Sequence, residues 1–494
     1  MKAPSFLRLA VSLLWTSGFW VGCGAPPAAS PEAAPAQIAW QDCPEGHAAT
    51  RCGTLKVYEN RIARAGRKID LYLEVYEAGS PNPAPDPIFF LAGGPGSAAT
   101  EDVARGQQFP FALSHTHDLV FVDQRGTGRS HRVVIPPSPD LTGLGEEQML
   151  ATLQPWAEQV LAEMDMDPRF YTTWFAMEDL DEVRAALGYD QINLFGHSYG
   201  ATAAQYYLRQ HEDRVRSAVL SGGTRLDIPV FEVWARNAQR ALDLVFARCA
   251  ADEACRRAYP NLREEFAGLV ERLRQEPLAY EFINPAGGEP GRVVYTADLL
   301  AEVVRMMTLD ARFTARLPRL VHQAYAENDW TGIHAFLLEY GTGDWGPQMM
   351  ERVIRCGEKW ADFSPEEVIR QSGESYFAGW NTSLAYSHAL ACRLTPQGEL
   401  PEGRAAQPVS KVPILIFNGE ADPQGPPENM AGYKDLWPNS LLVVEPYQGH
   451  WLSDFSEITC RWAIQADFTE KATVEGLDTS CMEDVTYPPF DTSG

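Results

Sequence analysis

The chain has 494 residues, which is long for one compact core, so we expect a core domain with a large insertion or a second domain. Hydrophobic residues make up 45% of the sequence and charged residues 22%, an ordinary composition for a folded soluble protein. The formal net charge of -25 argues against nucleic acid as a partner, because phosphate binding needs clustered Lys and Arg.

The first residues predict a targeting segment. Lys2 and Arg8 precede an apolar run from Leu9 to Val21, which is too short and too interrupted by polar residues for a membrane span. This pattern predicts a signal peptide over 1–22. It therefore predicts export to the periplasm, to the outer membrane as a lipoprotein, or out of the cell.

The end of the apolar run, Val21-Gly22-Cys23, resembles the lipobox of bacterial lipoproteins, whose cysteine is acylated and becomes the first mature residue. Trp20 departs from the small aliphatic residue usual at that position, so cleavage with secretion is the alternative to a lipid anchor through Cys23. The following residues, up to Gln37, are rich in proline and alanine and have no face to bury. They predict a flexible tether over 23–40.

Eight cysteines follow Cys23, and an even number in an exported chain predicts disulfides, with buried free thiols as the alternative. The sequence contains no C-x-x-C pair, so it predicts no metal site and no redox role, and we expect no cofactor. Local clustering of the cysteines favours four pairs: Cys43 with Cys52, Cys249 with Cys255, Cys356 with Cys392, and Cys460 with Cys481.

Strand and helix signals alternate from Gly53 onward. Residues 55–58, 69–76 and 87–91 have strand patterns, and the last is apolar throughout, as in a strand covered on both faces. It leads into the glycine run Ala92-Gly-Gly-Pro-Gly96, where the backbone is free to turn its N–H groups toward a substrate oxygen. A simple strand-ending turn is the alternative for this run.

A further buried strand over 119–122 leads into the segment DQRGTGRS. We expect Asp123 and Arg125 to brace this loop through charge-assisted hydrogen bonds, without a part in the chemistry. Residues 145–187 have helical periodicity, and Gly188 ends the last of these helices before the next strand.

The most informative stretch is 191–204, QINLFGHSYGATAA, in which a short apolar strand passes through Gly-His-Ser-Tyr-Gly into a helix-prone run. A serine carried through so tight a turn has a strained backbone and an exposed hydroxyl, and Gly196 and Gly200 remove Cβ atoms that would clash. The pattern predicts a nucleophile elbow at Ser198. A glycine-rich turn that happens to contain a serine is the alternative.

If Ser198 is a nucleophile, the glycine run after the 87–91 strand becomes the expected oxyanion loop. The donors that we expect are the main-chain N–H groups of Gly94 and Tyr199. Gly93 competes for the first of these two roles.

A strand over 215–220 follows the elbow, and from about 225 to 405 the periodicity becomes helical. Such an insertion predicts a helical cap that covers the active site and shapes its pocket. Strand patterns return at 412–417 and 441–444.

Each of these last two strands is followed by a residue that can take part in proton transfer with Ser198. A carboxylate after one strand and a histidine after the next are where an α/β-hydrolase carries its acid and base. We therefore expect Asp422 to orient His450, and His450 to take the proton from Ser198. Glu420 is the competing acid, but Asp422 has the shorter side chain just before the turn at a proline. His197, inside the elbow, should point away from the serine.

These signals together predict an α/β protein of the α/β-hydrolase fold, with a mostly parallel sheet flanked by helices and a large helical cap insertion. The predicted organisation is a signal peptide over 1–22, a tether over 23–40, the first part of the core over 41–225, the cap over 226–405, and the second part of the core over 406–494.

With GGPG, DQRGTGRS, GHSYG, GEAD and QGH in place, the chain resembles the proline iminopeptidase and tripeptidyl aminopeptidase family of serine exopeptidases. The resemblance covers nearly the whole mature chain and is nearer to the exported, disulfide-bearing tripeptidyl branch. It implies Ser198 as nucleophile, His450 as base and Asp422 as acid, with Gly94 and Tyr199 as oxyanion donors. These are the roles that the sequence patterns already predict. Family members with HGGPG have histidine where this chain has Ala92, which weakens the case for a strictly proline-releasing enzyme.

The first hypothesis is an exported serine aminopeptidase that releases short N-terminal peptides or residues from peptides with a free N-terminus. The substrate ammonium would need a buried cap carboxylate, for which the candidates are Glu339, Asp344, Glu351 and Glu374. An esterase or amidase acting on small-molecule acyl substrates would use the same machinery, and a non-catalytic binding protein on this fold is a third hypothesis. The sequence leaves the oligomeric state open.

Overall fold

The computed structural model describes residues 37–104, 111–136, 139, 146–284, 287–341, 349–358, 363–398, 400, 406–451 and 456–493, without the side chains of 111, 112, 146 and 456–458. The predicted signal peptide, Cys23 and most of the predicted tether lie outside these residues. Residues 36–494 form one compact unit. None of the helices in the described ranges is long and apolar enough to cross a membrane.

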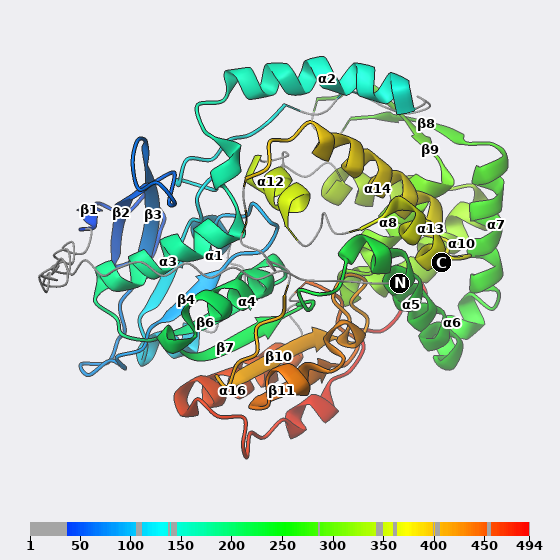
Figure 1. The fold of residues 1–494 in the computed structure, drawn as a ribbon. Coiled ribbons are helices and arrows are strands. Elements are labelled where there is room, and N and C mark those ends of the chain that lie inside the picture. Colours follow the sequence, from blue (N-terminus) through cyan, green and yellow to red (C-terminus); the bar gives the residue numbers. More distant parts are fainter. Residues whose placement is uncertain are drawn as a thin grey trace, which may run out of the picture. The chain divides into compact units, whose positions relative to one another are not determined.

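A nine-stranded sheet runs through this unit in the order β1-β2-β3-β5-β4-β6-β7-β10-β11 (Figure 1). The first three strands and the β3–β5 pair are antiparallel, and all pairs from β5 to β11 are parallel. The strands are β1 (Ala39–Gln41), β2 (Arg51–Tyr58), β3 (Lys68–Tyr76), β4 (Ile88–Leu91), β5 (Leu119–Val122), β6 (Ile192–His197), β7 (Val215–Ser221), β10 (Ile414–Gly419) and β11 (Ser440–Glu445).

Helices cover both faces of the sheet, because the central strands are apolar on both sides. Phe89 and Leu91 of β4 pack in one cluster with α3 and α4, and Ile88 and Phe90 pack in another with α1 and α16. The helices of this core are α1 (Ala99–Ala104), η1 (Phe111–His115), α2 (Glu146–Glu163), η2 (Pro168–Phe170), α3 (Thr173–Leu187), α4 (Tyr199–His211), η3 (Glu212–Arg214), η6 (Pro427–Met430), α15 (Tyr433–Leu436), α16 (Ser456–Lys471) and η7 (Ser480–Asp484). The arrangement is the predicted α/β-hydrolase fold.

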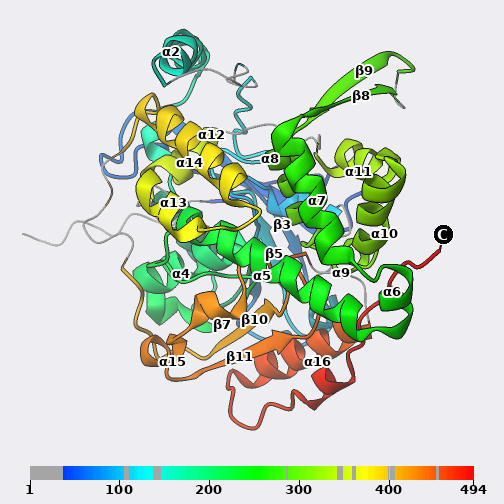
Figure 2. The same cartoon turned by 90° about the vertical axis from the view of Figure 1, so that its right-hand side faces the viewer.

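The segment between β7 and β10, which we call the cap, has its own apolar core. Figure 1 shows its helices beside the sheet, and Figure 2 shows them in front of the strands. They are α5 (Val230–Ala251), α6 (Glu253–Ala258), α7 (Leu262–Gln275), α8 (Ala297–Met307), α9 (Ala311–Thr314), α10 (Leu317–His322), η4 (Gln323–Glu327), α11 (Thr331–Phe336), η5 (Leu337–Gly341), α12 (Met349–Gly357), α13 (Pro365–Ser372) and α14 (Ala378–Arg393).

Two features of this region differ from the prediction. The cap contains an antiparallel hairpin, β8 (Leu278–Ile283) with β9 (Pro290–Tyr295), which projects from the helices in Figure 2. Every second residue of β8 is exposed, a period of two that the helical prediction overlooked. The predicted tether is also too long, because Ala39 and Trp40 already pair with β2 as part of β1.

The C-terminal segment leaves the core and packs on the cap. The Asp491 N–H donates to the carbonyl of Ala315 at 3.0 Å, and the Asp491 carboxylate forms an ion pair with Arg319 at 3.0 Å. Phe490 is buried in the apolar core of the cap. The last described residues therefore tie the cap to the end of the chain.

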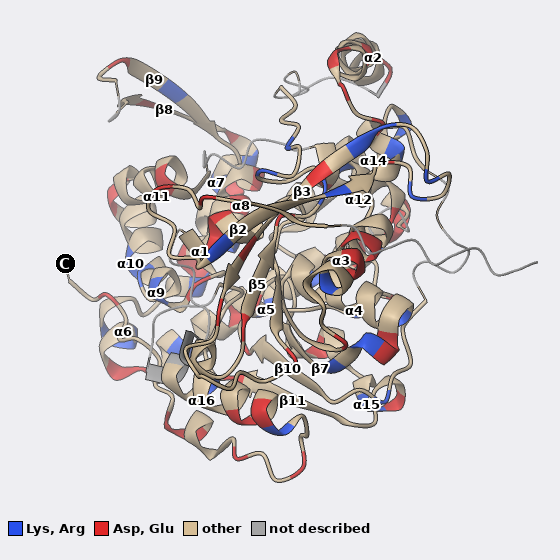
Figure 3. Cartoon of the chain, turned by 90° about the vertical axis from the view of Figure 1, so that its left-hand side faces the viewer, with Lys and Arg blue, Asp and Glu red and all other residues tan. Residues whose placement is uncertain are grey.

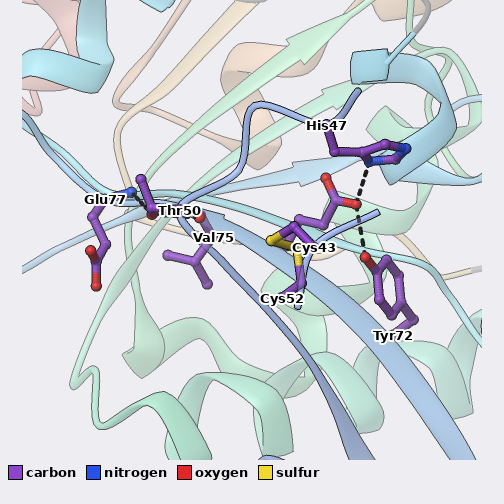
Figure 4. The surroundings of a disulfide bond; sticks show 8 residues. Cys43, His47, Thr50, Cys52, Tyr72, Val75 and Glu77 are labelled. Atoms are coloured by element: carbon purple, nitrogen blue, oxygen red, sulfur yellow. Dashed lines mark hydrogen bonds and ion pairs between the residues drawn. A yellow bond between two sulfur atoms is a disulfide. The ribbon is translucent and has the colours of Figure 1, made fainter. Parts of the chain in front are cut away.

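All four predicted disulfides are present. Figure 4 shows the first of them, Cys43–Cys52, near His47 and Tyr72. Both of these side chains bond the buried carboxylate of Glu74, His47 Nδ1 at 2.6 Å and Tyr72 Oη at 3.0 Å. Burial, followed by the charge of Glu74, raises the pKa of Tyr72. The disulfide thus holds the segment with Cys43 and His47, before β2, close to Tyr72 and Glu74 of β3.

Acidic and basic side chains are interspersed along the chain. Figure 3 shows Asp and Glu on α3, α6 and α16, with Lys and Arg between them. An acidic surface of this kind serves solubility.

The Cys356–Cys392 bridge closes a loop of 36 residues between α12 and α14, whereas Cys249–Cys255 closes a loop of 6. Because a longer loop loses more chain entropy on closure, we expect Cys356→Ala with Cys392→Ala to lower the unfolding free energy by about 4 kcal/mol and the matched Cys249→Ala, Cys255→Ala pair by about 2 kcal/mol. Chemical denaturation of both variants measures this. An equal loss in the two would contradict it.

Candidate active site

Ser198 lies between β6 and α4 with φ 58° and ψ -121°, a strained conformation for a residue with a side chain. The flanking glycines are required by close packing. A Cβ atom on Gly200 would lie 1.9 Å from the carbonyl oxygen of Leu91, and one on Gly196 would lie 2.2 Å from the carbonyl oxygen of Gly200. The helix can therefore approach β4 and β6 only with glycine at both positions, as the elbow pattern predicted.

The structure brings Ser198, His450 and Asp422 together in one hydrogen-bonded relay. His450 Nδ1 lies 2.7 Å from Asp422 Oδ2, and His450 Nε2 lies 2.9 Å from Ser198 Oγ. An ionised carboxylate can only accept, so Nδ1 carries the hydrogen and Nε2 is left to accept from the serine hydroxyl. The imidazole is thus in the tautomer that can take the serine proton.

Strand order explains why residues so far apart in sequence meet. The strands β6, β7, β10 and β11 are consecutive and parallel, so the loops after β6, β10 and β11 open at the same edge of the sheet. Asp422 is fully buried, and its second oxygen accepts from the N–H groups of Gln424 and Gly425 at 2.7 and 2.8 Å. These bonds fix the carboxylate toward the imidazole.

The competing acid, Glu420, has a different set of partners. Its side chain pairs with Arg248 at 2.5 Å and accepts from the Tyr447 N–H at 2.9 Å. It braces the loop between β11 and His450 and does not contact the imidazole.

The expected oxyanion donors both border the cavity above the serine. This cavity encloses about 530 Å³ of atom-free space, part of it continuous with solvent, and Gly94 and Tyr199 line it together with Ser198 and His450. Tyr199 is the first residue of α4, so its N–H has no acceptor within the helix. Gly93 does not line the cavity, although a Cβ there would lie 3.5 Å from that of Ser198.

His197 points away from the serine, as expected from its place in the elbow. Its Nδ1 lies 2.9 Å from Ser221 Oγ, which also accepts from Arg461 at 2.8 Å, and its ring lies 5.3 Å from that of His450. Burial, reinforced by the charges of His450 and Arg461, holds the pKa of His197 well below its usual range. A neutral His197 adds no positive charge beneath the imidazole of His450.

Asp123 and Arg125 brace the loop after β5, as predicted. The Arg125 guanidinium grips Asp179 through two bonds of 2.7 and 2.8 Å. Asp123 accepts from the N–H and the hydroxyl of Thr100 and from the N–H of Arg129. Burial raises the pKa of Asp123 to about 6.

The cap contributes Val230, Trp234 and Arg355 to the cavity, and the described residues of its lining include no carboxylate. The candidates proposed for an ammonium site therefore do not line it: Glu339 and Glu374 are exposed, Glu351 pairs with Arg355, and Asp344 lies outside the described residues. Sequence analysis missed Arg355, because no local pattern shows which face of α12 turns toward Ser198.

A buried carboxylate of the cap was also missed. Glu358 is 1% exposed and accepts from the Thr173 N–H at 2.5 Å. Burial, with the nearby charge of Glu358, raises the pKa of Tyr199 well above its usual range. The charge of Glu358 thus affects the Tyr199 side chain, although Glu358 does not line the cavity.

Among the described residues, one group of side chains is close enough to hold a metal ion: Cys356, His388 and Cys392. Its two cysteines are joined as a disulfide, so they are not available as thiolate ligands.

The sequence profile of the alpha/beta hydrolase fold matches residues 86–457, which is most of the chain. The protein belongs to this family. The family match spans the elbow, the cap and both loops that carry the other members of the relay.

Two relatives are similar in sequence to part of this α/β-hydrolase. A proline iminopeptidase of Neisseria gonorrhoeae is 32% identical over 149 residues, or 30% of this chain and 36% of the relative. The serine protease Hip1 of Mycobacterium bovis is 28% identical over 181 residues, or 33% of this chain and 35% of the relative. The chain thus spans about a third of the length of each.

A solved structure, the proline iminopeptidase of Mycobacterium smegmatis, aligns with 85% of this chain and 98% of its own at 14% identity and a TM-score of 0.38.

The buried carboxyl of Asp123 gives a pH-dependent prediction. Its pKa in the folded state, about 6, lies above the value near 3.9 of an unfolded chain, so between those pH values the folded state holds a proton that the unfolded state has lost. The contribution of Asp123 to stability therefore falls as pH rises from about 4 to about 6. We expect the unfolding free energy of the native protein, minus that of Asp123→Asn, to fall by up to about 1.4 kcal/mol per pH unit there.

Denaturation at several pH values measures this difference. Asp70→Asn is the control, because Asp70 is about half exposed and pairs with Lys56 at the surface. A difference between native protein and Asp123→Asn that does not change with pH would contradict the prediction.

Proposed function

We propose that this α/β-hydrolase is an exported serine aminopeptidase that releases short N-terminal peptides or residues, of tripeptidyl or prolyl type, from peptides with a free N-terminus. The observation that carries the proposal is the relay in which Ser198, His450 and Asp422 lie 2.9 and 2.7 Å apart. The names of the relatives, proline iminopeptidase and serine protease, support a peptide as substrate.

The proposed mechanism assigns one role to each member of the relay. His450 Nε2 takes the hydroxyl proton of Ser198 as the oxygen attacks the scissile carbonyl, while Asp422 stabilises the imidazolium. The N–H groups of Gly94 and Tyr199 hold the oxyanion, each donor contributing about 3 kcal/mol. His450 then protonates the leaving amine, and water releases the acyl group from Ser198.

Export is proposed on two grounds. The first is the signal-peptide pattern of residues 1–22, followed by Cys23 as an acylation site or by simple secretion. The second is the set of four disulfides, which form and persist in oxidising compartments outside the cytosol.

An esterase or amidase acting on small-molecule acyl substrates is the second candidate. The observation that favours it is the cavity lining, which in its described part includes Arg355, Val230 and Trp234 but no carboxylate for the substrate ammonium. Both functions use the same relay and differ in the group that is bound beside the scissile bond.

The relay itself predicts the effect of removing its acid. Asp422→Asn lets the amide donate toward His450 and so favours the wrong tautomer, and we expect kcat to fall by about 10³- to 10⁴-fold. The matched control is Glu428→Gln, in the same segment after β10, because its carboxylate is more than half exposed and pairs with Arg240. This variant should stay within a few-fold of the native rate. The rate of Ser198 labelling by a fluorophosphonate reports the same loss without a chosen substrate. Equal rates for the two variants would remove Asp422 from the mechanism.

Substrate class is tested with a panel of peptide amides. We expect tripeptidyl or aminoacyl amides with a free N-terminus to be hydrolysed, and their N-acetylated forms to be hydrolysed at least about tenfold more slowly, because acetylation removes the ammonium charge. Ser198→Ala controls for other hydrolases in the preparation. Equal turnover of blocked and free peptides, or turnover of aryl esters alone, would contradict the aminopeptidase and favour the esterase or amidase.

A further inference from the structure

The residue that follows His450 is anchored in the cap. The Trp451 N–H donates to the carbonyl of Leu309, in the turn between α8 and α9, at 2.8 Å. The indole ring packs on the apolar core of the cap, with its centroid 6.1 Å from that of Phe313 and 6.0 Å from that of Tyr340. One backbone bond and one set of aromatic contacts therefore fix the segment just after His450 to the cap.

The same turn of the cap leaves no room for a side chain at the residue before His450. A Cβ atom on Gly449 would lie 2.4 Å from the carbonyl oxygen of Leu309 and 2.5 Å from that of Thr308. Both neighbours are backbone atoms, which cannot turn aside as the end of a side chain can. The cap is therefore in close contact with the chain on both sides of His450.

Arg248 of α5 supports the segment farther upstream. Its guanidinium lies 4.6 Å from the ring centroid of Tyr447, three residues before His450. It also pairs with Glu420 at 2.5 Å, and the Glu420 carboxylate accepts from the Tyr447 N–H at 2.9 Å. Tyr447 has a φ of 63°, which is uncommon for a bulky residue and persists only where neighbouring groups hold it.

The relay tolerates little movement of this segment. The imidazole of His450 lies 2.7 Å from Asp422 and 2.9 Å from Ser198, and a displacement of about 1 Å would take either distance beyond hydrogen-bonding range. The core supports the segment through a bond of 2.8 Å from the Ala421 N–H to the carbonyl of Gln448. The contacts with the cap add support on either side of the base.

The helix that carries Arg248 also lines the substrate cavity. Val230 and Trp234, in the first two turns of α5, border the space above Ser198, and Arg248 lies in the last turn. The helix is continuous over 22 residues, so Trp234 and Arg248 are separated by about 21 Å along its axis. A movement of α5 that widened the cavity would therefore also draw Arg248 away from the segment with His450.

We propose that the cap positions the catalytic base, with Trp451 and Arg248 holding His450 in line with Ser198, so that the serine is activated only while the cap is docked. This inference rests on the proposed function for the roles of Ser198 and His450, and it holds for a peptidase and an esterase alike. Trp451 and Arg248 act through the backbone of the segment and not on the reacting atoms, so they are positioning residues.

Fluorophosphonate labelling of Ser198 in the full chain tests the proposal, because its dependence on reagent concentration separates binding from chemistry. We expect Trp451→Ala to lower the maximal labelling rate by about 10- to 100-fold and to leave the half-saturating concentration within about threefold, since a misplaced base slows the chemical step. Trp451→Phe keeps an aromatic ring in the cap and should restore most of the rate. The same split is expected between kcat and KM for a hydrolysed substrate.

The matched control is Phe336→Ala. Phe336 is 3% exposed and packs on the same two rings as Trp451, with its centroid 5.2 Å from that of Phe313 and 4.8 Å from that of Tyr340, but it lies on α11. We expect this variant to lose at least as much stability in thermal unfolding as Trp451→Ala and to keep the maximal labelling rate within about threefold. An equal loss of rate in both variants would overturn the inference, because damage to the cap core would then explain it.

Arg248→Met tests the upstream support. We expect the maximal labelling rate to fall by about tenfold with little change in the half-saturating concentration, and Arg248→Lys, which keeps the charge, to restore part of it. The control is Arg263→Met. Arg263 also pairs with a carboxylate, Asp243 at 2.7 Å, and lies 4.6 Å from an aromatic ring, that of Phe246, but both partners belong to the cap. This variant should keep the native rate.

The outcomes separate this inference from the function on which it rests. If Ser198 takes no label in the native protein, the serine hydrolase fails and the inference fails with it. If Ser198 is labelled but peptides are not hydrolysed, the aminopeptidase fails, and a loss of labelling rate in Trp451→Ala and Arg248→Met still supports the inference. Unchanged maximal rates in these two variants, once thermal unfolding shows that they are folded, would overturn the positioning role and leave the serine hydrolase standing.

Discussion

The close approach of α4 to strands β4 and β6 is the constraint on which the site depends. It leaves no room for side chains at residues 196 and 200, and it forces Ser198 into a backbone conformation that places its hydroxyl above the sheet. The same approach brings the first N–H of α4 next to the serine, where a negative charge would develop during acyl transfer. One packing contact thus positions both the proposed nucleophile and one proposed oxyanion donor.

The parallel half of the sheet brings Asp422 and His450 to the serine. Adjacent strands end at one edge, so the loops after β10 and β11 reach the serine although they follow it by more than two hundred residues. Each loop is then held by bonds that are not part of the relay, such as those of Gln424 and Gly425 to Asp422 and of Arg248 to Glu420. The orientation of His450 is therefore set before any substrate arrives.

Sequence patterns predicted the core more completely than the cap, for a physical reason. Buried parallel strands are continuous apolar runs, the elbow is a local backbone requirement, and the disulfides join cysteines that are near in sequence, so each signal lies within a short stretch. The hairpin β8–β9 has a local signal, the alternating exposure of β8, but it lies within a long segment of helical periodicity and was overlooked. Arg355 and the true positions of Glu339, Glu351 and Glu374 depend on how the cap helices pack, which no short stretch encodes.

The segment with Phe490 and Asp491 packs on the cap, which lies much earlier in the sequence. Asp491 and Phe490 contact the cap, although the preceding strand β11 and helix α16 belong to the α/β core. A rigid-body movement of the cap away from the core would have to break the contacts of Asp491 with Ala315 and Arg319. Residues 490 and 491 therefore limit how far the cap can move away from the core as one body.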